Sequence, residues 1–101
     1  MQIIWSVEAD FTFNKELDFI YSKWTINEVN NYIYLVEKFI DSLKKGVLKG
    51  KVLNNNMRSF VISKQTTLFF TYNEDRKVIK LLLFWNNTQN PKKLKKILER
   101  L

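Results

Sequence analysis

The fold is decided by residues 57–85, which read MRSFVISKQTTLFFTYNEDRKVIKLLLFW. Within this stretch, residues 57–63, 67–72 and 78–85 are dense in β-branched and aromatic side chains, and short polar segments separate the three runs. Residues of these types favour strands, and short polar connections join strands that are neighbours in a sheet. The stretch therefore predicts three consecutive antiparallel strands, a β-meander.

The segment before the meander predicts a short strand and a hairpin of two helices. Residues 2–6 form a β-type run, and apolar residues recur at helical spacing over residues 8–24. Thr25 opens a capping-box sequence, so a second helix begins there, and Gly46 is a natural place for that helix to end. Residues 46–56 then form a basic connector to the meander.

A last helix begins at Pro91, because proline suits the first position of a helix. The predicted order is β-α-α-β-β-β-α in a single domain over residues 1–101, an α+β fold with an antiparallel sheet packed against the two-helix hairpin. Residues 78–85 are apolar at every position except Lys80, so both faces of that strand are apolar. Either the last helix covers the second face of the sheet, or part of that face remains for a partner.

The composition excludes several classes of site. The chain has 101 residues, of which 46% are hydrophobic and 15% aromatic, and this is too apolar for a disordered segment. The absence of cysteine and histidine excludes disulfides, thiol nucleophiles, histidine-based triads and Cys/His zinc sites. We expect no metal and no cofactor. The apolar runs are far shorter than the ~20 residues of a membrane span, and the signal-peptide pattern is missing, so we expect a cytoplasmic protein.

The net charge of +7 is distributed unevenly along the chain. Residues 1–50 hold six lysines and seven acids, whereas residues 51–101 hold eleven lysines and arginines and three acids. Such asymmetry suggests a polyanionic target or an acidic partner surface. The acids of the first half are expected on the exteriors of the helices, where they would not form an acid–base dyad.

The basic residues are the candidates for binding a target or nucleic acid. Arg58 can contact a phosphate or a carboxylate, or it can be a solvated charge near a sheet edge. The last helix is basic and amphipathic, which suits nucleic acid, an acidic partner or a membrane surface, and equally a packing helix with a solvated outer face. The candidate set is Lys49, Lys51, Arg58, Lys64, Gln89, Lys92 and Lys93.

Alternation along residues 78–85 predicts which face of that strand meets a partner. Lys80 marks the solvent-side face, and Leu82 and Phe84 share this face because side chains alternate along a strand. The opposite face, toward the helices, then carries Ile79, Leu81, Leu83 and Trp85. A β-bulge within the strand would reverse this assignment.

Taken end to end, the chain resembles the RelE/ParE superfamily, the toxins of type II toxin–antitoxin modules. The resemblance rests on the order and spacing of several pieces. They are residues 3–6 (IIWS) with Ala9, 20–24 (IYSKW), the long second helix, 57–64 (MRSFVISK), 68–70 (LFF) and, most specifically, 84–94 (FWNNTQNPKKL). It implies the fold order given above and a cognate antitoxin as partner. The antitoxin would contact the solvent-side set Lys80, Leu82 and Phe84. We expect no membrane partner.

Activity divides within this family. RelE-like members cleave mRNA in the ribosomal A site with basic residues and a tyrosine, whereas ParE-like members inhibit DNA gyrase. Carried over by position, the RelE pattern is met at Arg58, but Phe60, Thr67 and Thr88 stand where basic residues are expected. No tyrosine follows Tyr72, so the C-terminal tyrosine of the pattern is absent as well. A threonine supplies neither the charge nor the bidentate donors of a guanidinium.

These departures favour a non-enzymatic, ParE-like inhibitor with DNA gyrase as its target, or a weakened member of the family. The first alternative is a RelE-like endoribonuclease, an mRNA interferase that acts at the ribosome through Arg58, Lys64 and other basic residues. The second alternative is an interaction module that has lost toxicity and keeps its protein partner.

Overall fold

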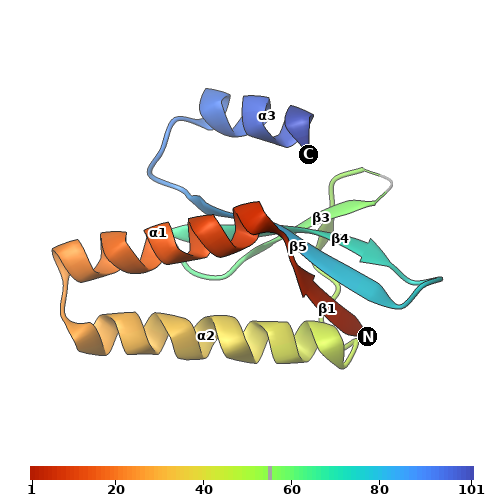
Figure 1. Ribbon diagram of the computed structural model, residues 1–101, viewed down its shortest axis with the longest axis horizontal. Coiled ribbons are helices and arrows are strands. Elements are labelled where there is room, and N and C mark those ends of the chain that lie inside the picture. The colour runs from red at the N-terminus through yellow and green to blue at the C-terminus, as the bar shows by residue number, and fades with distance from the viewer. Residues whose placement is uncertain (55) are drawn as a thin grey trace.

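The computed structural model describes residues 1–54 and 56–101 and shows an α+β fold with three helices and a five-stranded sheet (Figure 1). In chain order the elements are β1 (Gln2–Trp5), α1 (Val7–Lys23), α2 (Ile26–Lys44), β2 (Lys51–Val52), β3 (Met57–Val61), β4 (Thr66–Asn73), β5 (Val78–Asn86) and α3 (Pro91–Arg100). The predicted elements are present. A short strand, β2, is added within the predicted connector 46–56, of which position 55 lies outside the described residues.

The sheet has the strand order β1-β5-β4-β3-β2. The β3–β4 and β4–β5 pairs are antiparallel, which confirms the predicted meander. β1 pairs with β5 in parallel, so the sheet is mixed, and the prediction of an antiparallel sheet is wrong. Parallel neighbours need a long crossover between them. Here the crossover is the whole chain between β1 and β5, so no local sequence pattern marks the pairing.

The helices begin and end near the predicted residues. Ser6 precedes α1, and its Oγ accepts a hydrogen bond from the backbone N of Ala9 at 2.9 Å. The Ser6 hydroxyl also donates to the carbonyl of Leu82 at 3.2 Å, which fastens the start of α1 to β5. Thr25 precedes α2, but its side chain makes no capping hydrogen bond. Gly46 follows α2 with a φ of 75°, the left-handed conformation in which many helices end.

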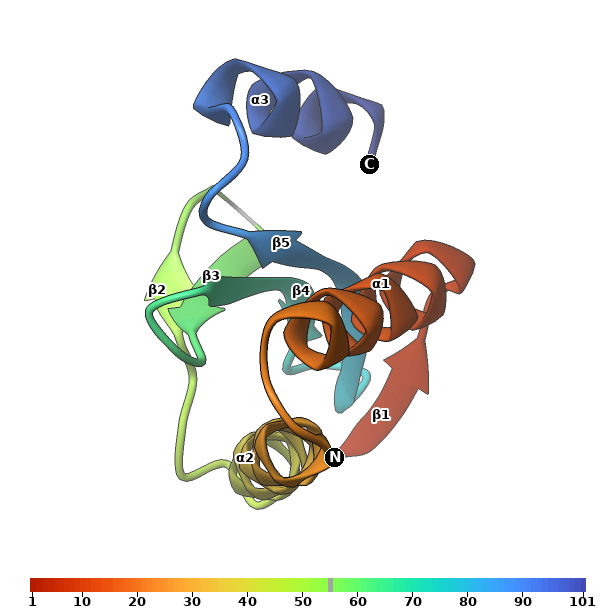
Figure 2. The ribbon, with the colours of Figure 1, turned by 90° about the vertical axis from the view of Figure 1, so that its left-hand side faces the viewer.

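The α1–α2 hairpin covers one face of the sheet, and α3 covers the other (Figure 1, Figure 2). The face under the hairpin, which we call the hairpin face, holds the larger core, including Phe39, Leu43, Leu68, Phe70 and Leu81. The opposite face, which we call the α3 face, holds a smaller buried cluster of Phe69, Leu82, Leu83 and Trp85. Three side chains of α3 pack against this cluster, Leu94, Ile97 and Leu98. The last helix therefore covers the apolar part of the second face.

A β-bulge interrupts β5. Phe69 pairs with Leu83, but the next residue of β4, Phe70, pairs with Leu81. Leu82 is therefore an additional residue on β5, and the alternation of faces reverses after it.

The bulge overturns the sequence-based assignment of faces in the second half of β5. Phe84, expected on the solvent-side face, is 2% exposed and lies in the hairpin-face core. Leu82 is buried in the α3-face cluster, so only Lys80 of the predicted partner-contact set is exposed. Leu83 and Trp85, expected toward the helix hairpin, lie in the α3-face cluster instead.

Candidate functional site

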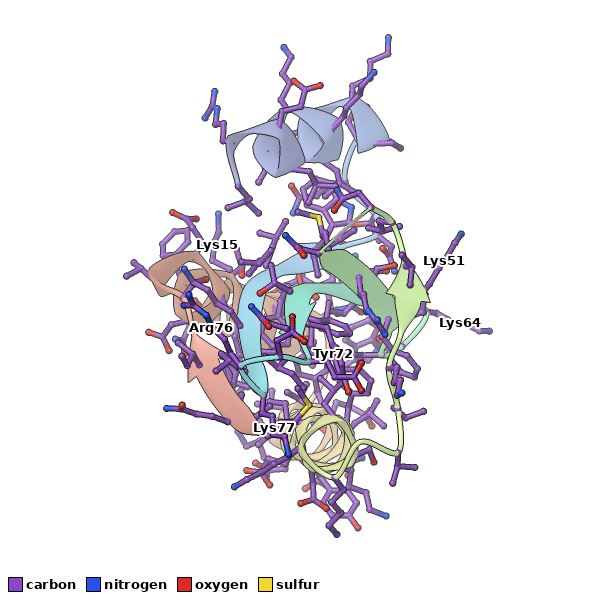
Figure 3. The ribbon with its side chains drawn as sticks, turned by 90° about the vertical axis from the view of Figure 1, so that its right-hand side faces the viewer. Lys15, Lys51, Lys64, Tyr72, Arg76 and Lys77 are labelled. Carbon is purple, nitrogen blue, oxygen red and sulfur yellow. The ribbon has the colours of Figure 1, made fainter. Side chains whose placement is uncertain are left out.

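The predicted basic residues form separate groups. The first group lies where β2 meets β3 and consists of Lys49, Lys51 and Arg58; Lys51 projects from this edge of the sheet (Figure 3). Arg58 Nη1 donates a hydrogen bond to the Lys49 carbonyl at 3.1 Å. The guanidinium lies over the ring of Tyr72, with its central carbon 4.4 Å from the ring centroid. A guanidinium held in this way keeps further donors for a phosphate or a carboxylate.

Lys64 lies at the other end of β3, in the turn that leads to β4. Its carbonyl accepts a hydrogen bond from Asn87 Nδ2 at 3.2 Å, and the carbonyl of Gln65 accepts one from the backbone N of Asn87 at 2.6 Å. These bonds hold the β3–β4 turn against the turn that follows β5. The length of β3 therefore separates Lys64 from Arg58, the two basic residues named for the endoribonuclease alternative.

The resemblance expects arginine at positions 67 and 88, where this chain has threonine. Thr67 lies on β4 and Thr88 lies in the turn after β5. The Thr67 hydroxyl donates to Asn87 Oδ1 at 2.9 Å, and the Thr88 hydroxyl donates to Asn86 Oδ1 at 2.5 Å. The two hydroxyls thus fix the conformation of the turn. Thr67 belongs to the α3 face of the sheet, whereas Arg58 belongs to the hairpin face. The structure does not bring Arg58 to the positions of the two missing arginines.

A cleft of about 470 Å³ opens between α1 and α3, over the end of β5. Residues 83–85 of β5 contribute to its lining, together with side chains of α1, of α3 and of the turn before α3. Two of the predicted target-binding residues, Gln89 and Lys93, line the cleft, whereas Lys92 is not part of its lining. The charged residues of the lining are Glu8, Lys15, Glu16, Lys93 and Arg100.

Glu16 is the residue of this cleft that the sequence analysis missed. It is 4% exposed, and its Oε2 accepts a hydrogen bond of 2.5 Å from the hydroxyl of Thr66 on β4. The prediction that the acids of the first half lie on helix exteriors is wrong for this residue. The sequence does contain a signal for the burial of Glu16, because position 16 falls on the apolar stripe of the helix between Phe13 and Ile20. A buried carboxyl group costs free energy unless donors compensate it, and the hydroxyl of Thr66 supplies one such donor.

Tyr32 on α2 is a second buried polar residue, 6% exposed. Burial raises the pKa of its phenol well above the ordinary value; the nearby Thr66 hydroxyl opposes this rise, and the charge of Glu16 adds to it. Thr66 gives its proton to Glu16, and among the described residues Tyr32 Oη has no hydrogen-bond partner. Gln65 Nε2 is likewise buried without a hydrogen-bond partner among the described residues. Tyr32 and Gln65 both line a shallow cavity of about 260 Å³.

We expect Tyr32 to make the protein less stable as the pH rises above about 10. The folded protein holds the phenol proton more tightly than the unfolded chain, so the unfolded state loses the proton first. The free energy of unfolding then falls by about 1.4 kcal/mol per pH unit above the unfolded pKa, and below it the contribution is fully present. Urea unfolding of the wild type and of Tyr32→Phe at pH 8 and pH 11 isolates this effect, since the two proteins share their other titrating groups. A stability difference between them that is the same at both pH values would contradict the prediction.

Within residues 1–54 and 56–101, no group of three or more Asp and Glu side chains is arranged to hold a metal ion. In the same part of the chain, none of the helices combines the length and the apolar character that crossing a bilayer requires. The two features with binding chemistry are therefore the basic group at the β2–β3 edge and the cleft between α1 and α3. No protein-family model and no curated protein matches the chain, so its function is inferred from these residues and their geometry.

Proposed function

We propose that this chain is the toxin of a type II toxin–antitoxin module, a cytoplasmic, ParE-like protein that inhibits DNA gyrase by binding and is neutralised by a cognate antitoxin. The resemblance to the RelE/ParE superfamily along the chain supports this proposal. So does the architecture, in which a helix hairpin packs on one face of a meander. The basic second half of the chain supplies the charge for an acidic partner or target surface.

The observation that favours a binding inhibitor over an endoribonuclease is the separation of the basic residues. Arg58 lies against Tyr72 on the hairpin face, and Lys64 lies beyond the far end of β3. Cleavage of RNA needs preorganised donors that converge on the charge developing in the transition state, and the loss of one such donor typically costs about 100–1,000-fold in rate. Arg58 and Lys64 do not converge, and threonine hydroxyls committed to a turn replace two further cations.

The exposed part of the α3 face is the proposed contact surface for the antitoxin. Lys80 remains available there, and Ile4 pairs with it across the β1–β5 ladder and is 39% exposed. Leu82 and Phe84 are buried, so they are not part of the proposed antitoxin contact. An acidic antitoxin segment fits this surface because the second half of the chain holds eleven basic and three acidic residues.

Pulse-labelling of DNA and protein synthesis, after induction of the chain alone in a bacterium, tests the proposal. We expect DNA synthesis to fall first, because inhibition of gyrase stops replication before it depletes mRNA. If protein synthesis falls first, the target is the ribosome and the endoribonuclease alternative replaces the proposal. If neither falls while soluble protein accumulates, the chain is an interaction module and the toxin proposal is wrong.

A matched pair of arginine variants tests the basic group at the β2–β3 edge in the same assay. Arg58→Gln removes the guanidinium that stacks on Tyr72, whereas Arg76→Gln removes one from the exposed β4–β5 turn (Figure 3). We expect Arg58→Gln to delay the fall in DNA synthesis and Arg76→Gln to behave as the wild type. Equal behaviour of the two variants would remove Arg58 from the target contact.

A further inference from the structure

β1 forms one edge of the sheet. It stands first in the strand order β1-β5-β4-β3-β2, so within residues 1–54 and 56–101 only β5 pairs with it. Figure 2 and Figure 3, which view the molecule from opposite sides, both show β1 at the outside of the fold. Two of its four side chains, Ile4 and Trp5, are 39% and 38% exposed. The side of β1 that faces away from β5, which we call the β1 edge, is therefore open to another chain.

The hydrogen bonds between β1 and its neighbour show which backbone groups point to the open side. The backbone N atoms of Gln2 and Ser6 donate to backbone carbonyls on the β5 side, at 2.9 and 3.1 Å. Successive residues of a strand direct their backbone groups to opposite sides, so the even-numbered residues bond toward β5. Ile3 and Trp5 therefore direct their N–H and C=O groups to the β1 edge.

The two edges of the sheet differ in how they are protected. Soluble proteins commonly protect an open edge with lysine, proline, a bulge or a very short strand. At the opposite edge, β2 has two residues, one of which is Lys51, and Lys49 precedes it closely. β1 contains no charged residue and no proline, and its pairing with β5 runs without a register shift. The β1 edge is thus suited to accept a further strand, whereas the β2 edge is not.

The beginning of β1 lies among basic residues. Lys77 and Lys44 lie beside it, because their carbonyls accept hydrogen bonds from the backbone N atoms of residues 1–2, at 2.9 and 3.0 Å (Figure 3). Both lysines are exposed. Glu74 and Asp75 belong to the same turn as Lys77, but they follow β4, which lies on the far side of β5 from β1.

The end of β1 leads into an acidic segment. Glu8 and Asp10 lie in the first turn of α1, which begins two residues after Trp5, and both acids are exposed. The strand therefore has a basic beginning and an acidic end. Two copies of such a strand are complementary in charge when they run in opposite directions, and they repel each other at both ends when they run in the same direction.

We propose that β1 pairs with β1 of a second copy of this chain, antiparallel and about a two-fold axis at Ile4, so that the two sheets become one continuous sheet. In this register Ile3 of each copy lies opposite Trp5 of the other. The outward N–H and C=O groups of these residues then form two hydrogen-bonded pairs, and Ile4 lies opposite Ile4 in the non-hydrogen-bonded pair between them. The same patch serves both copies, as a two-fold dimer requires.

The dimer would cover apolar surface as well as backbone groups. The two Ile4 side chains would meet on the α3 face, where residues of a non-hydrogen-bonded pair are close neighbours. The exposed side of Trp5 lies next to the axis, and the exposed Val7 follows it at the start of α1. Because the pairing involves only four residues of each strand, the interface belongs to the small, weak class, and we expect a reversible dimer.

The dimer does not rest on the proposed function and is compatible with it. Ile4 also belongs to the proposed antitoxin contact, which includes Lys80 on the same face. The two-fold axis would place the α3 faces of both copies on the same side of the joined sheet. The two antitoxin contacts would then form one continuous surface.

Sedimentation velocity of the purified chain tests the dimer, over a concentration series that reaches about 0.5 mM so that a weak dimer is populated. We expect the average mass to rise from that of a monomer toward that of a dimer. Ile4→Lys places like charges opposite each other and should weaken dimerisation at least about tenfold. Val52→Lys makes the same change at an exposed position of the opposite edge strand and should dimerise as the wild type does.

A mixture of two variants tests the register. Neither Ile4→Lys nor Ile4→Glu alone should dimerise, because like charges would face each other across the axis. An equimolar mixture of the two should form a heterodimer, because opposite charges then occupy the facing positions. This recovery would also show that both variants are folded, so the loss of dimer in each variant alone would not come from unfolding.

Cross-linking gives an independent test, because the chain contains no cysteine. In the proposed register the two side chains at position 4 have Cβ atoms about 4.5–5.5 Å apart, and a small adjustment brings them within the range of a disulfide. Under mild oxidation, Ile4→Cys should therefore form a covalent dimer much faster than Val52→Cys, in which the new thiol lies at the opposite edge of the sheet.

Three results would overturn the proposal. A wild type that stays monomeric at the highest concentration would leave the β1 edge to a strand of another protein. Dimerisation of Ile4→Lys as strong as that of the wild type would place the interface elsewhere, and so would equally fast cross-linking of Ile4→Cys and Val52→Cys. All of these measurements use the purified chain and need no toxicity. The dimer can therefore fail while the toxin proposal stands, and the reverse also holds.

Discussion

We expect Phe84→Ala to lower the free energy of unfolding by about 3–5 kcal/mol, the range for truncating a buried phenylalanine. Phe84 is 2% exposed and lies in the hairpin-face core. Its ring stacks on Trp5 with the centroids 5.4 Å apart and packs against Phe13 at 5.3 Å. Removal of the ring leaves a cavity between β1, α1 and β5 and breaks both aromatic contacts. Its neighbours are fixed in a strand and a helix, so they can close the cavity only in part.

Urea unfolding followed by circular dichroism measures this loss, and Lys80→Ala provides the control on the same strand. Lys80 is exposed, so its truncation should change the free energy of unfolding by no more than about 0.5 kcal/mol. The sequence-based alternation placed Phe84 and Lys80 on the same solvent-side face. If that placement were right, the two variants would have similarly small effects, and a loss of less than about 1 kcal/mol for Phe84→Ala would contradict the structure.

The strand that contains Phe84 shows why one part of the fold could not be predicted. Residues 81–85 read LLLFW, so after Lys80 no polar side chain marks the alternation of faces. The additional residue of the bulge, Leu82, is as apolar as its neighbours, so the hydrophobic pattern of the strand does not reveal the bulge. The reversal of faces depends on pairing with β4, which is information that β5 alone does not contain.

The elements themselves could be predicted because their signals are local. α1 was expected over residues 8–24 and runs Val7–Lys23, with Ser6 as its cap. The three strands of the meander lie within two residues of their expected bounds, and Pro91 begins the last helix as expected. Capping residues, proline and hydrophobic periodicity are signals that extend over only a few residues. The elements they predict therefore depend little on the surrounding tertiary structure. The parallel pairing of β1 with β5 joins two segments that are far apart in the chain. No local signal marks it, and it was not predicted.

In the candidate site as well, local features could be predicted and long-range contacts could not. Gln89 and Lys93 were predicted as binding residues and do line the cleft, but no sequence pattern indicates that they lie opposite α1. The carboxyl group of Glu16 is held by a hydrogen bond that the hydroxyl of Thr66 donates, fifty residues later in the chain. An acid on an apolar stripe indicates burial, yet its hydrogen-bond partner depends on how α1 packs against β4. Such long-range contacts have no local sequence signal.

We expect Gly50→Ala to lower the free energy of unfolding by about 3 kcal/mol, through backbone strain and overpacking together. Gly50 has a φ of 75°, a conformation that costs a residue with a Cβ about 1–2 kcal/mol. A Cβ at this position would stand 2.7 Å from Phe70 Cζ and 2.9 Å from the carbonyl oxygen of Ser59. Phe70 is fully buried and Ser59 is held in the sheet by its pairing, so neither can withdraw without disturbing the β2–β3–β4 region.

Gly46→Ala separates the two causes, because Gly46 has the same φ of 75° and a Cβ there would have no atom within 4 Å. Its cost should therefore be that of the backbone conformation alone, about 1–2 kcal/mol. The difference between the two variants, measured by urea unfolding, isolates the close approach of the chain to Phe70 and Ser59 at Gly50. Equal losses would mean that the segment before β2 can move away from the sheet. In that case the carbonyl of Lys49 would no longer be fixed beside Arg58, and the basic group at the β2–β3 edge would lose the contact that orients its guanidinium.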